Sequence, residues 1–221
     1  MARALVIGAS GGIGAALVRA LEGRGVVVRG LSRRADGLDV TDEASVSTAL
    51  SPLEGPFEMV LVATGALAPE GKGPEKSLRH LEGGQIAAQF ALNAMGPALV
   101  LKHALRLMPR EGRAVFAALS ARVGSIGDNG LGGWYSYRAS KAALNQLIHT
   151  GAIEVARTHR QAICVTLHPG TVDTGFGAEF HRGMQTVTPD EAAANLLRVI
   201  DGLTPADTGG FFDWSGARVP W

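Results

Sequence analysis

The residues best suited to chemistry lie in the heptapeptide YSYRASK, residues 135–141. Tyr137 and Lys141 stand four positions apart where Ser, Ala and Leu favour a helix, so both side chains can project into one cleft. A neighbouring ammonium favours the phenolate, and we expect it to lower the pKa of Tyr137 from its usual value near 10. Tyr137 could then donate a proton to a carbonyl oxygen or accept one from an alcohol. Tyr135 has Ala139 at the matching position and lacks such a partner, and an amphipathic surface helix is the alternative interpretation of the pair.

A second motif, GASGGIG over residues 8–14, joins an apolar segment to a helical one. Gly8, Gly12 and Gly14 allow a tight turn, close approach of the backbone to a pyrophosphate, and packing of the helix on its strand. The free N–H groups at the start of the helix would then face the phosphates. The spacing differs from the common G-x-G-x-x-G fingerprint, because two residues follow Gly8 before the next glycine. A purely structural turn is the alternative.

Short apolar runs alternate with helical patterns along the whole chain. The runs predict strands over residues 3–9, 26–32, 57–64, 113–120, 162–169 and 209–214, with a weaker strand over 37–40. The helical patterns cover residues 13–23, 42–50, 80–108, 137–158 and 189–203. Continuous apolar runs favour strands buried on both faces, and the alternation predicts an α/β doubly wound, mostly parallel sheet of about seven strands. In such a sheet the ligand binds beyond the carboxyl ends of the strands, where the strand order reverses.

The composition fits one domain spanning residues 1–221, because 46% of the residues are apolar and can form a sizeable core. A net charge of +1 gives no general attraction to nucleic acid or an anionic membrane. The single cysteine, Cys164, cannot form an intrachain disulfide, which fits a cytoplasmic protein. No apolar run is long enough to span a membrane, and the N-terminal segment lacks the features of a signal peptide.

Three motifs together resemble the short-chain dehydrogenase/reductase family: GASGGIG, YSYRASKAAL, and HPGTVDT over residues 168–174. The resemblance covers nearly the full chain, and residues 119–145 are similar to the branch of C-factor-type and sniffer-type carbonyl reductases. It implies a Rossmann fold, NAD(H) or NADP(H) as cofactor, and hydride transfer between a carbonyl and an alcohol. It also implies a small-molecule substrate and a homodimer or homotetramer.

The resemblance assigns roles to the motif residues. Tyr137 is the general acid/base, and Lys141 lowers its pKa and binds the nicotinamide ribose. Asn93 matches the asparagine whose main-chain carbonyl holds a water in the proton relay. Pro97 lies four residues later and has no N–H for that carbonyl, which leaves the carbonyl available to a water, although a simple helix kink would explain the proline equally well.

Two positions depart from the family pattern. The usual Asn-Asn-Ala-Gly after the strand is ATGA over residues 63–66, where Ala63 and Gly65 still allow close approach to the cofactor. The substrate-binding serine usually precedes the tyrosine by thirteen residues, but Gly124 occupies that position and Ala121 replaces the second serine of a common Ser-Ser pair. Ser120 and Ser125 remain as candidates, and we favour Ser120 because it ends a predicted strand.

The cofactor is predicted to be NADP(H), with NAD(H) as the alternative. Where NAD-preferring members carry an acid, this chain has Ser32 followed by Arg33 and Arg34, which suit a 2′-phosphate unless they form only a solvated basic turn. Asp39 and Val40 resemble the residues that surround the adenine. The full predicted cofactor-binding set is Gly8, Ser10, Gly11, Gly12, Ile13, Gly14, Arg33, Arg34, Asp39, Val40, Ala63, Gly65, Asn93, Tyr137, Lys141, Pro169, Gly170, Val172 and Thr174.

The chain thus resembles an NADPH-dependent reductase of small or medium apolar ketones or aldehydes. The predicted pocket wall is Leu131, Trp134, Phe176, Phe180 and Met184. The six histidines lack metal-binding spacing, so no metal site is predicted, and His168 is expected to pack or to be solvated. A nicotinamide-binding regulatory or signalling protein is the main alternative. A sugar-nucleotide epimerase would need a larger C-terminal region, and a cofactor-free structural protein would leave the glycine turn unexplained.

Overall fold

The computed structural model describes residues 1–69, 73–174 and 185–221. In these ranges six strands form one sheet with the order β2-β1-β3-β4-β5-β6, and every neighbouring pair is parallel. The strands are β1 (Arg3–Ile7), β2 (Val27–Leu31), β3 (Met59–Val62), β4 (Ala114–Leu119), β5 (Ala162–His168) and β6 (Phe211–Asp213). The predicted α/β sheet is therefore confirmed, with strands slightly shorter than the apolar runs.

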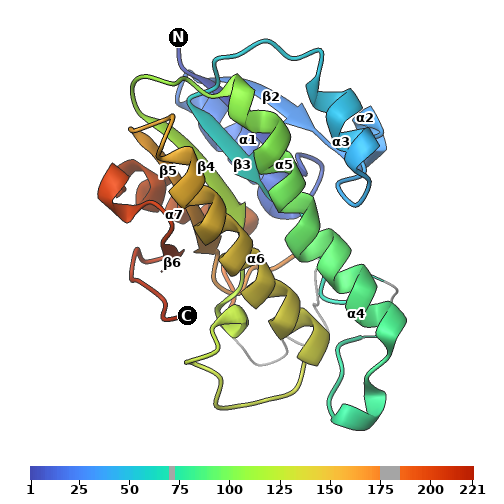
Figure 1. Cartoon of the computed structure of the whole chain (residues 1–221). Coiled ribbons are helices and arrows are strands. Elements are labelled where there is room, and N and C mark those ends of the chain that lie inside the picture. Colours follow the sequence, from blue (N-terminus) through green and yellow to red (C-terminus); the bar gives the residue numbers. More distant parts are fainter. Residues whose placement is uncertain (70–72, 175–184) are drawn as a thin grey trace.

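Helices cover both faces of the sheet (Figure 1). They are α1 (Gly12–Gly23), α2 (Arg33–Asp36), α3 (Glu43–Leu50), α4 (Gly83–Phe90), α5 (Gly96–Ala104), α6 (Tyr135–Val155) and α7 (Pro189–Gly202). One core layer joins the sheet to α3, α5 and α6, and the other joins it to α1 and α7. None of the helices in the described ranges is long and apolar enough to cross a bilayer.

The strand order makes the sheet doubly wound. From β1 the chain passes to β2 on one side and then returns to β3 on the other side of β1. The carboxyl ends of β1 and β3 therefore flank the point at which the strand order reverses, where α/β sheets bind their ligands. The glycine turn follows β1, and the segment ATGA follows β3.

The weak strand predicted over residues 37–40 does not form. Gly37 adopts the left-handed conformation, with φ of 68°, at the end of α2. The N–H of Leu38 donates to the Ser32 carbonyl at 3.3 Å, and the N–H of Asp39 donates to Ser45 Oγ at 2.9 Å. These local bonds occupy the groups that a strand would pair, so the described sheet has six strands rather than about seven.

The helix predicted over residues 80–108 is continuous only from α4 to α5. Between them lies a π-helical segment, η2 (Ala91–Met95), and three-residue 3₁₀ turns lie outside both ends, at Leu78–His80 and Leu105–Leu107. The π segment ends two residues before Pro97, which offers no N–H to the preceding turn. The proline thus coincides with a change of helix type at Asn93.

Candidate active site

A cleft of about 990 Å³ opens at the carboxyl edge of the sheet. Twelve of the predicted site residues line it: Gly11, Gly12, Ile13, Ala63, Gly65, Ser120, Tyr137, Lys141, Pro169, Gly170, Val172 and Thr174. The remaining predicted residues are not part of this lining: Gly8, Ser10, Gly14, Arg33, Arg34, Asp39, Val40 and Asn93. The structure therefore brings the glycine turn and the tyrosine–lysine pair to one cleft.

The glycine turn has the geometry of a phosphate-binding loop. Gly8 has φ of 86°, and a Cβ there would lie 2.9 Å from the Ala63 carbonyl oxygen. A Cβ on Gly14 would lie 2.1 Å from the Gly8 carbonyl oxygen. Helix α1 begins after Gly11, and no described side chain caps it. Uncapped N–H groups at a cleft-facing helix start suit a pyrophosphate, so this wall fits a dinucleotide.

Tyr137 and Lys141 project from α6 into the cleft, as the four-residue spacing predicts. Both are buried, with 5% and 3% of their surface exposed, and Lys141 Nζ lies 5.9 Å from the centre of the Tyr137 ring. Lys141 Nζ also donates to the Leu119 carbonyl at 2.8 Å. A Cβ on Gly124 would lie 2.7 Å from the Lys141 Cβ, so the close approach of that loop to α6 requires glycine where the family usually has serine.

The pKa of Tyr137 differs from the sequence-based expectation. Burial raises it, and burial lowers the pKa of Lys141 to about 7. The expected lowering by the ammonium is absent, because desolvation disfavours the charged form of each group. A tyrosine with a raised pKa keeps its proton at neutral pH and can serve as a proton donor.

The Asn93 side chain makes contacts that the sequence did not predict. Its Nδ2 donates to the Ala66 carbonyl at 2.9 Å, while the N–H of Ala66 donates to Asn93 Oδ1 at 3.0 Å. Asn93 Nδ2 also lies 3.3 Å from Ser140 Oγ, which in turn donates to the Tyr137 carbonyl at 2.9 Å. The buried amide therefore ties the segment after β3 to α6. The predicted water-holding role of its main-chain carbonyl stays a prediction.

The two candidate serines have different surroundings. Ser120 lines the cleft, and its Oγ donates to Asn145 Oδ1 on α6 at 2.8 Å. Ser125 is 1% exposed and accepts the N–H of Asp128 at 3.1 Å. Ser125 is not part of the cleft lining, whereas Ala121 is. Position in the cleft thus supports Ser120, although its hydroxyl hydrogen is already directed at Asn145.

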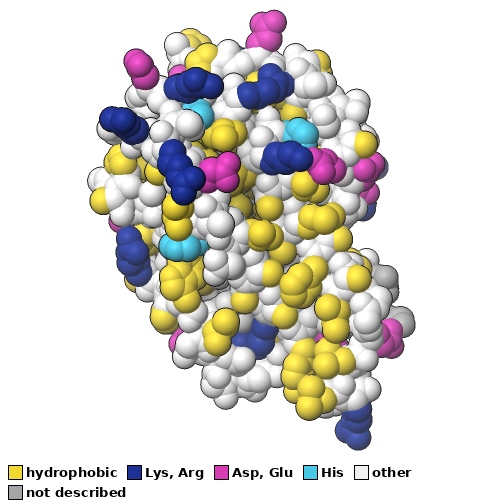
Figure 2. Space-filling model, in the orientation of Figure 1, with side chains coloured by type: hydrophobic (Ala, Val, Ile, Leu, Met, Phe, Trp, Pro, Cys, Tyr) yellow, Lys and Arg dark blue, Asp and Glu magenta, His cyan; other side chains and the backbone are white. Residues whose placement is uncertain are grey.

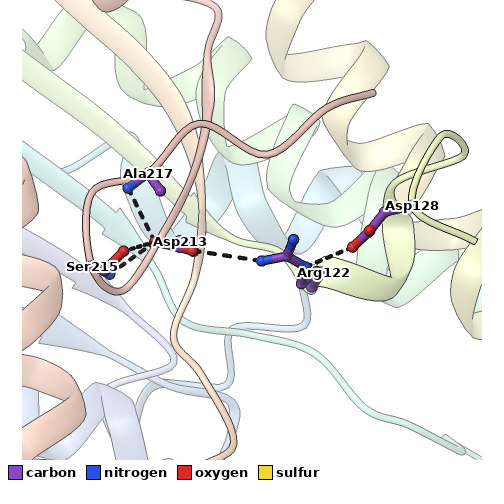
Figure 3. A network of polar contacts seen from close by, with 5 residues as sticks. All are labelled: Arg122, Asp128, Asp213, Ser215 and Ala217. Carbon is purple, nitrogen blue, oxygen red and sulfur yellow. Dashed lines mark hydrogen bonds and ion pairs between the residues drawn. The ribbon is translucent and has the colours of Figure 1, made fainter.

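An ion-pair network fixes the loop after β4 (Figure 3). Arg122, which lines the cleft, donates through Nε to Asp128 at 2.6 Å and lies 3.7 Å from Asp213 at the end of β6. Asp213 accepts hydrogen bonds from Ser215 and from the N–H of Ala217. The network connects the loop beyond Ser120 to the far edge of the sheet.

The predicted 2′-phosphate site lies on α2, where Arg33 and Arg34 are exposed. Sequence reasoning placed no acid here, but the Asp36 carboxylate accepts the N–H of Ser32 at 2.8 Å. Arg29, 3.5 Å from Asp36, partly offsets this charge. Arg33 and Arg34 therefore belong to the same short helix as one acidic residue, Asp36.

The outer wall of the cleft is described only in part. Leu131 and Trp134 line it as predicted, while the other predicted wall residues, Phe176, Phe180 and Met184, lie outside the described residues. His168 also lines the cleft. Burial lowers its pKa to about 4, so the imidazole is neutral at physiological pH.

Comparison with known proteins identifies the family. A family model described as enoyl-(acyl carrier protein) reductase, of the short-chain alcohol dehydrogenase type, matches residues 8–211. The chain belongs to the short-chain dehydrogenase/reductase family. This membership makes the protein an NAD(P)-dependent oxidoreductase, confirming the resemblance seen in the three motifs.

Two relatives and one solved structure place the chain within the family. It is 33% identical over the whole of both chains to 1-hydroxy-2-glutathionyl-2-methyl-3-butene dehydrogenase of Rhodococcus sp. strain AD45. It is 34% identical to the C-signal protein of Myxococcus xanthus, over 66% of this chain and 84% of that protein. The carbonyl reductase Sniffer of Drosophila melanogaster superposes with a TM-score of 0.82 at 20% identity, covering all of both chains. Within the short-chain dehydrogenase/reductase family the chain is thus similar in sequence to the C-signal protein, and it shares its fold with the Sniffer reductase.

Proposed function

We propose that the protein is an NADPH-dependent carbonyl reductase in which Tyr137 is the general acid/base. The observation that carries the proposal is the placement of Tyr137 and Lys141 on one wall of a cleft whose other wall is an uncapped glycine turn. When bound, the nicotinamide supplies the hydride for the carbonyl carbon. The chain's own residues supply the phosphate contacts and the proton.

The proton chemistry follows from burial. Tyr137 holds its proton at neutral pH, because burial raises its pKa, and it can donate that proton to the carbonyl oxygen as the alcohol forms. Lys141 lies close enough to stabilise the tyrosinate that remains, provided that it carries a proton. Asn93 keeps the segment after β3 against α6, which carries Tyr137.

NADPH is the proposed cofactor because Arg33 and Arg34 offer two guanidinium groups to a 2′-phosphate. A structural neighbour from Burkholderia multivorans contains bound NADP, and another, a carbonyl reductase from chicken fatty liver, contains NADPH. Small or medium apolar ketones and aldehydes fit the apolar side chains of Leu131 and Trp134 at the mouth of the cleft.

The test is the loss of NADPH absorbance with a panel of ketones and aldehydes. Tyr137→Phe should lower turnover by about two to four orders of magnitude and leave NADPH affinity unchanged. Tyr135→Phe is the matched control, because it removes the same hydroxyl from the same helix outside the cleft lining. Equal activity of Tyr137→Phe and Tyr135→Phe would remove Tyr137 from the mechanism.

A regulatory or signalling protein with incidental turnover is the second candidate, favoured by the similarity to the C-signal protein. The two candidates differ in what Tyr137→Phe does in the organism. A reductase loses its biological role together with turnover, whereas a cofactor-dependent signal keeps its role as long as NADPH still binds.

We also propose that the protein is a homodimer or homotetramer. Apolar side chains are spread over the face formed by α4, α5 and α6 (Figure 2). The large exposed apolar residues of these helices and of the π segment between them are Phe90, Met95, Leu147 and Ile153, between 37% and 54% exposed. Sedimentation equilibrium should give a mass of two or four chains, and a monomer would contradict the proposal.

A further inference from the structure

The first turn of α6 has no cap of the usual kind. The residue before the helix is Trp134, which adopts the left-handed conformation with φ of 53°. An indole carries a donor and no acceptor, so this side chain cannot accept the N–H groups of the first helical turn. Those groups belong to the turn that carries Tyr137, the third residue of the helix.

A buried acid from a distant segment supplies the missing acceptors. Glu75 is 3% exposed, and its Oε2 accepts the N–H of Ser136 at 3.2 Å. Its Oε1 accepts the Ser136 hydroxyl, and its main-chain carbonyl accepts the N–H of Trp134 at 2.6 Å. All three bonds end on Trp134 and Ser136, and Ser136 is the residue directly before Tyr137.

The charge of Glu75 also suits this place. Glu75 is almost completely buried, and a buried carboxylate needs compensation for its charge. The N-terminus of a 21-residue helix provides it, since the aligned peptide dipoles leave a partial positive charge there. The carboxylate and the helix start are therefore complementary in hydrogen bonding and in charge.

The segment that carries Glu75 is also bound to α4. Gln85 on α4 is 4% exposed, and its Nε2 donates to the Gly73 carbonyl at 3.0 Å. Gly73 lines the cleft. The short segment from Gly73 to Glu75 thus connects α4, the cleft wall and the start of α6.

We propose that Glu75 is a positioning residue, which fixes the first turn of α6 and thereby aims the Tyr137 hydroxyl at the reacting oxygen. The part of this proposal that concerns turnover rests on the proposed reductase function. The part that concerns the helix start does not, and it can be tested without a substrate.

The experiment compares Glu75→Ala and Glu75→Gln with Thr204→Ala. Thr204 also caps a helical turn, Pro205–Asp207, which lies between α7 and β6 and is not part of the cleft lining. Hydrogen exchange is measured by mass spectrometry on peptides that cover residues 134–141. Turnover is expressed per NADPH-binding site, so that unfolded material does not count.

Glu75→Ala should speed exchange in residues 134–141 at least about tenfold, because the Ser136 N–H loses its fixed side-chain acceptor and the first turn of α6 loses its carboxylate contacts. It should lower kcat per site by about ten- to hundredfold, the effect of a small misplacement of a catalytic group, with the Kd for NADPH changed less than about threefold. Glu75→Gln keeps an acceptor for the Ser136 N–H and should restore kcat to within about threefold of the wild type. Thr204→Ala should change neither measurement at α6.

If Glu75→Ala does not fold, Ser136→Ala and Glu75→Gln carry the test, because Ser136→Ala removes one of the three bonds and should give a smaller change in the same direction. Unchanged exchange at residues 134–141 in Glu75→Ala and Ser136→Ala overturns the proposal, and so does a kcat per site of these two variants equal to that of Thr204→Ala. A wild type that turns over none of the carbonyl compounds counts against the proposed function, and the exchange result then still decides whether Glu75 holds the turn of Tyr137.

Discussion

The two walls of the cleft are built in different ways. The wall after β1 is made by the backbone, since Gly8 and Gly14 allow approaches that any side chain would block. The wall formed by α6 depends on side-chain contacts with distant segments: Glu75 at its start, Asn93 beside its second turn, and Ser120 against Asn145. A wall made by the backbone is sensitive to substitution at a few glycines. A wall made by side chains depends on a larger number of residues, each with a smaller effect.

This difference predicts the largest effect at Gly14. Gly14→Ala places a Cβ 2.1 Å from the Gly8 carbonyl oxygen, so the turn must open. We expect the free energy of unfolding to fall by about 2–3 kcal/mol and NADPH affinity to fall by at least about hundredfold. Calorimetry with NADPH and urea unfolding measure the two quantities.

The control for Gly14→Ala is Gly23→Ala, because a Cβ on Gly23, in the same helix, meets nothing within 4 Å. It should leave NADPH binding unchanged and stabilise the helix by up to ~1 kcal/mol. NADPH binding that survives Gly14→Ala would show that the wall after β1 does not depend on glycine.

The next largest effect is expected at Arg33 and Arg34, the basic pair on α2. Replacing Arg33 and Arg34 by Gln should weaken NADPH binding by about ten- to hundredfold, through the loss of charge-assisted bonds to the 2′-phosphate, and should leave NADH binding nearly unchanged. The double variant Arg157→Gln/Arg160→Gln removes the same charge from exposed positions after α6 and controls for net charge. Equal wild-type affinity for NADPH and NADH, measured by calorimetry, would contradict the assignment.

The sequence predicted the wall after β1 better than the α6 wall, for a physical reason. Glycine spacing directly reports close approaches of the backbone, and the four-residue spacing of Tyr137 and Lys141 directly reports a helix face. Nothing local to YSYRASK shows that Glu75, about sixty residues earlier, caps this helix, because that contact depends on how the segments cross in space. Burial is equally non-local, and for that reason the expected direction of the Tyr137 pKa was wrong.

The same reasoning applies to the elements of the fold. Long apolar runs such as the one that forms β5 were predicted nearly to the residue, because a strand buried on both faces has few alternatives. The short run at residues 37–40 has few apolar residues, and local hydrogen bonds to Ser32 and Ser45 prevented a strand there. The π segment around Asn93 depends on Pro97 and on tertiary packing together, so the uniform helical pattern did not reveal it.

Burial of Lys141 on the α6 wall predicts a dependence of stability on pH. Its pKa is about 7 in the folded protein and near 10.5 when exposed, so above pH 7 the unfolded chain binds one proton more than the folded one. The free energy of unfolding of the wild type should therefore rise with pH, relative to Lys141→Met, by roughly 1 kcal/mol per pH unit between pH 7 and 9. Below pH 7 both states are protonated and the difference should become constant.

Urea unfolding of both proteins at pH 6, 7, 8 and 9 measures this difference. Other groups, including the buried Cys164 thiol, titrate identically in the two proteins and cancel. A difference that stays flat from pH 7 to 9 would show that Lys141 keeps its proton when buried, in which case its charge is fully available to Tyr137.

The smallest effect is expected at Ser120 and Ser125, the two candidates for the substrate-binding serine. Ser120→Ala should lower kcat about tenfold, because Ser120 lines the cleft at the end of β4, where a rigid strand fixes the direction of its hydroxyl. Ser125→Ala should stay within about twofold of the wild type, because Ser125 is buried beneath the loop and only accepts the Asp128 N–H. Steady-state kinetics on both variants measures these effects. The reverse pattern would assign the substrate-binding role to Ser125.

The bond from Ser120 to Asn145 makes a finer test possible. Ser120 can donate to a substrate only if it releases Asn145 Oδ1, or if the Asn145 amide turns so that its Nδ2, which has no partner among the described residues, donates to Ser120 instead. Asn145→Asp supplies an acceptor and no such donor, so it should hold the Ser120 hydrogen away from the substrate and lower kcat as much as Ser120→Ala does. If Ser120 contacts the substrate, the double variant should be no worse than either single one, since both changes remove the same hydrogen bond. Additive losses would mean that Ser120 and Asn145 only stabilise the packing of β4 against α6.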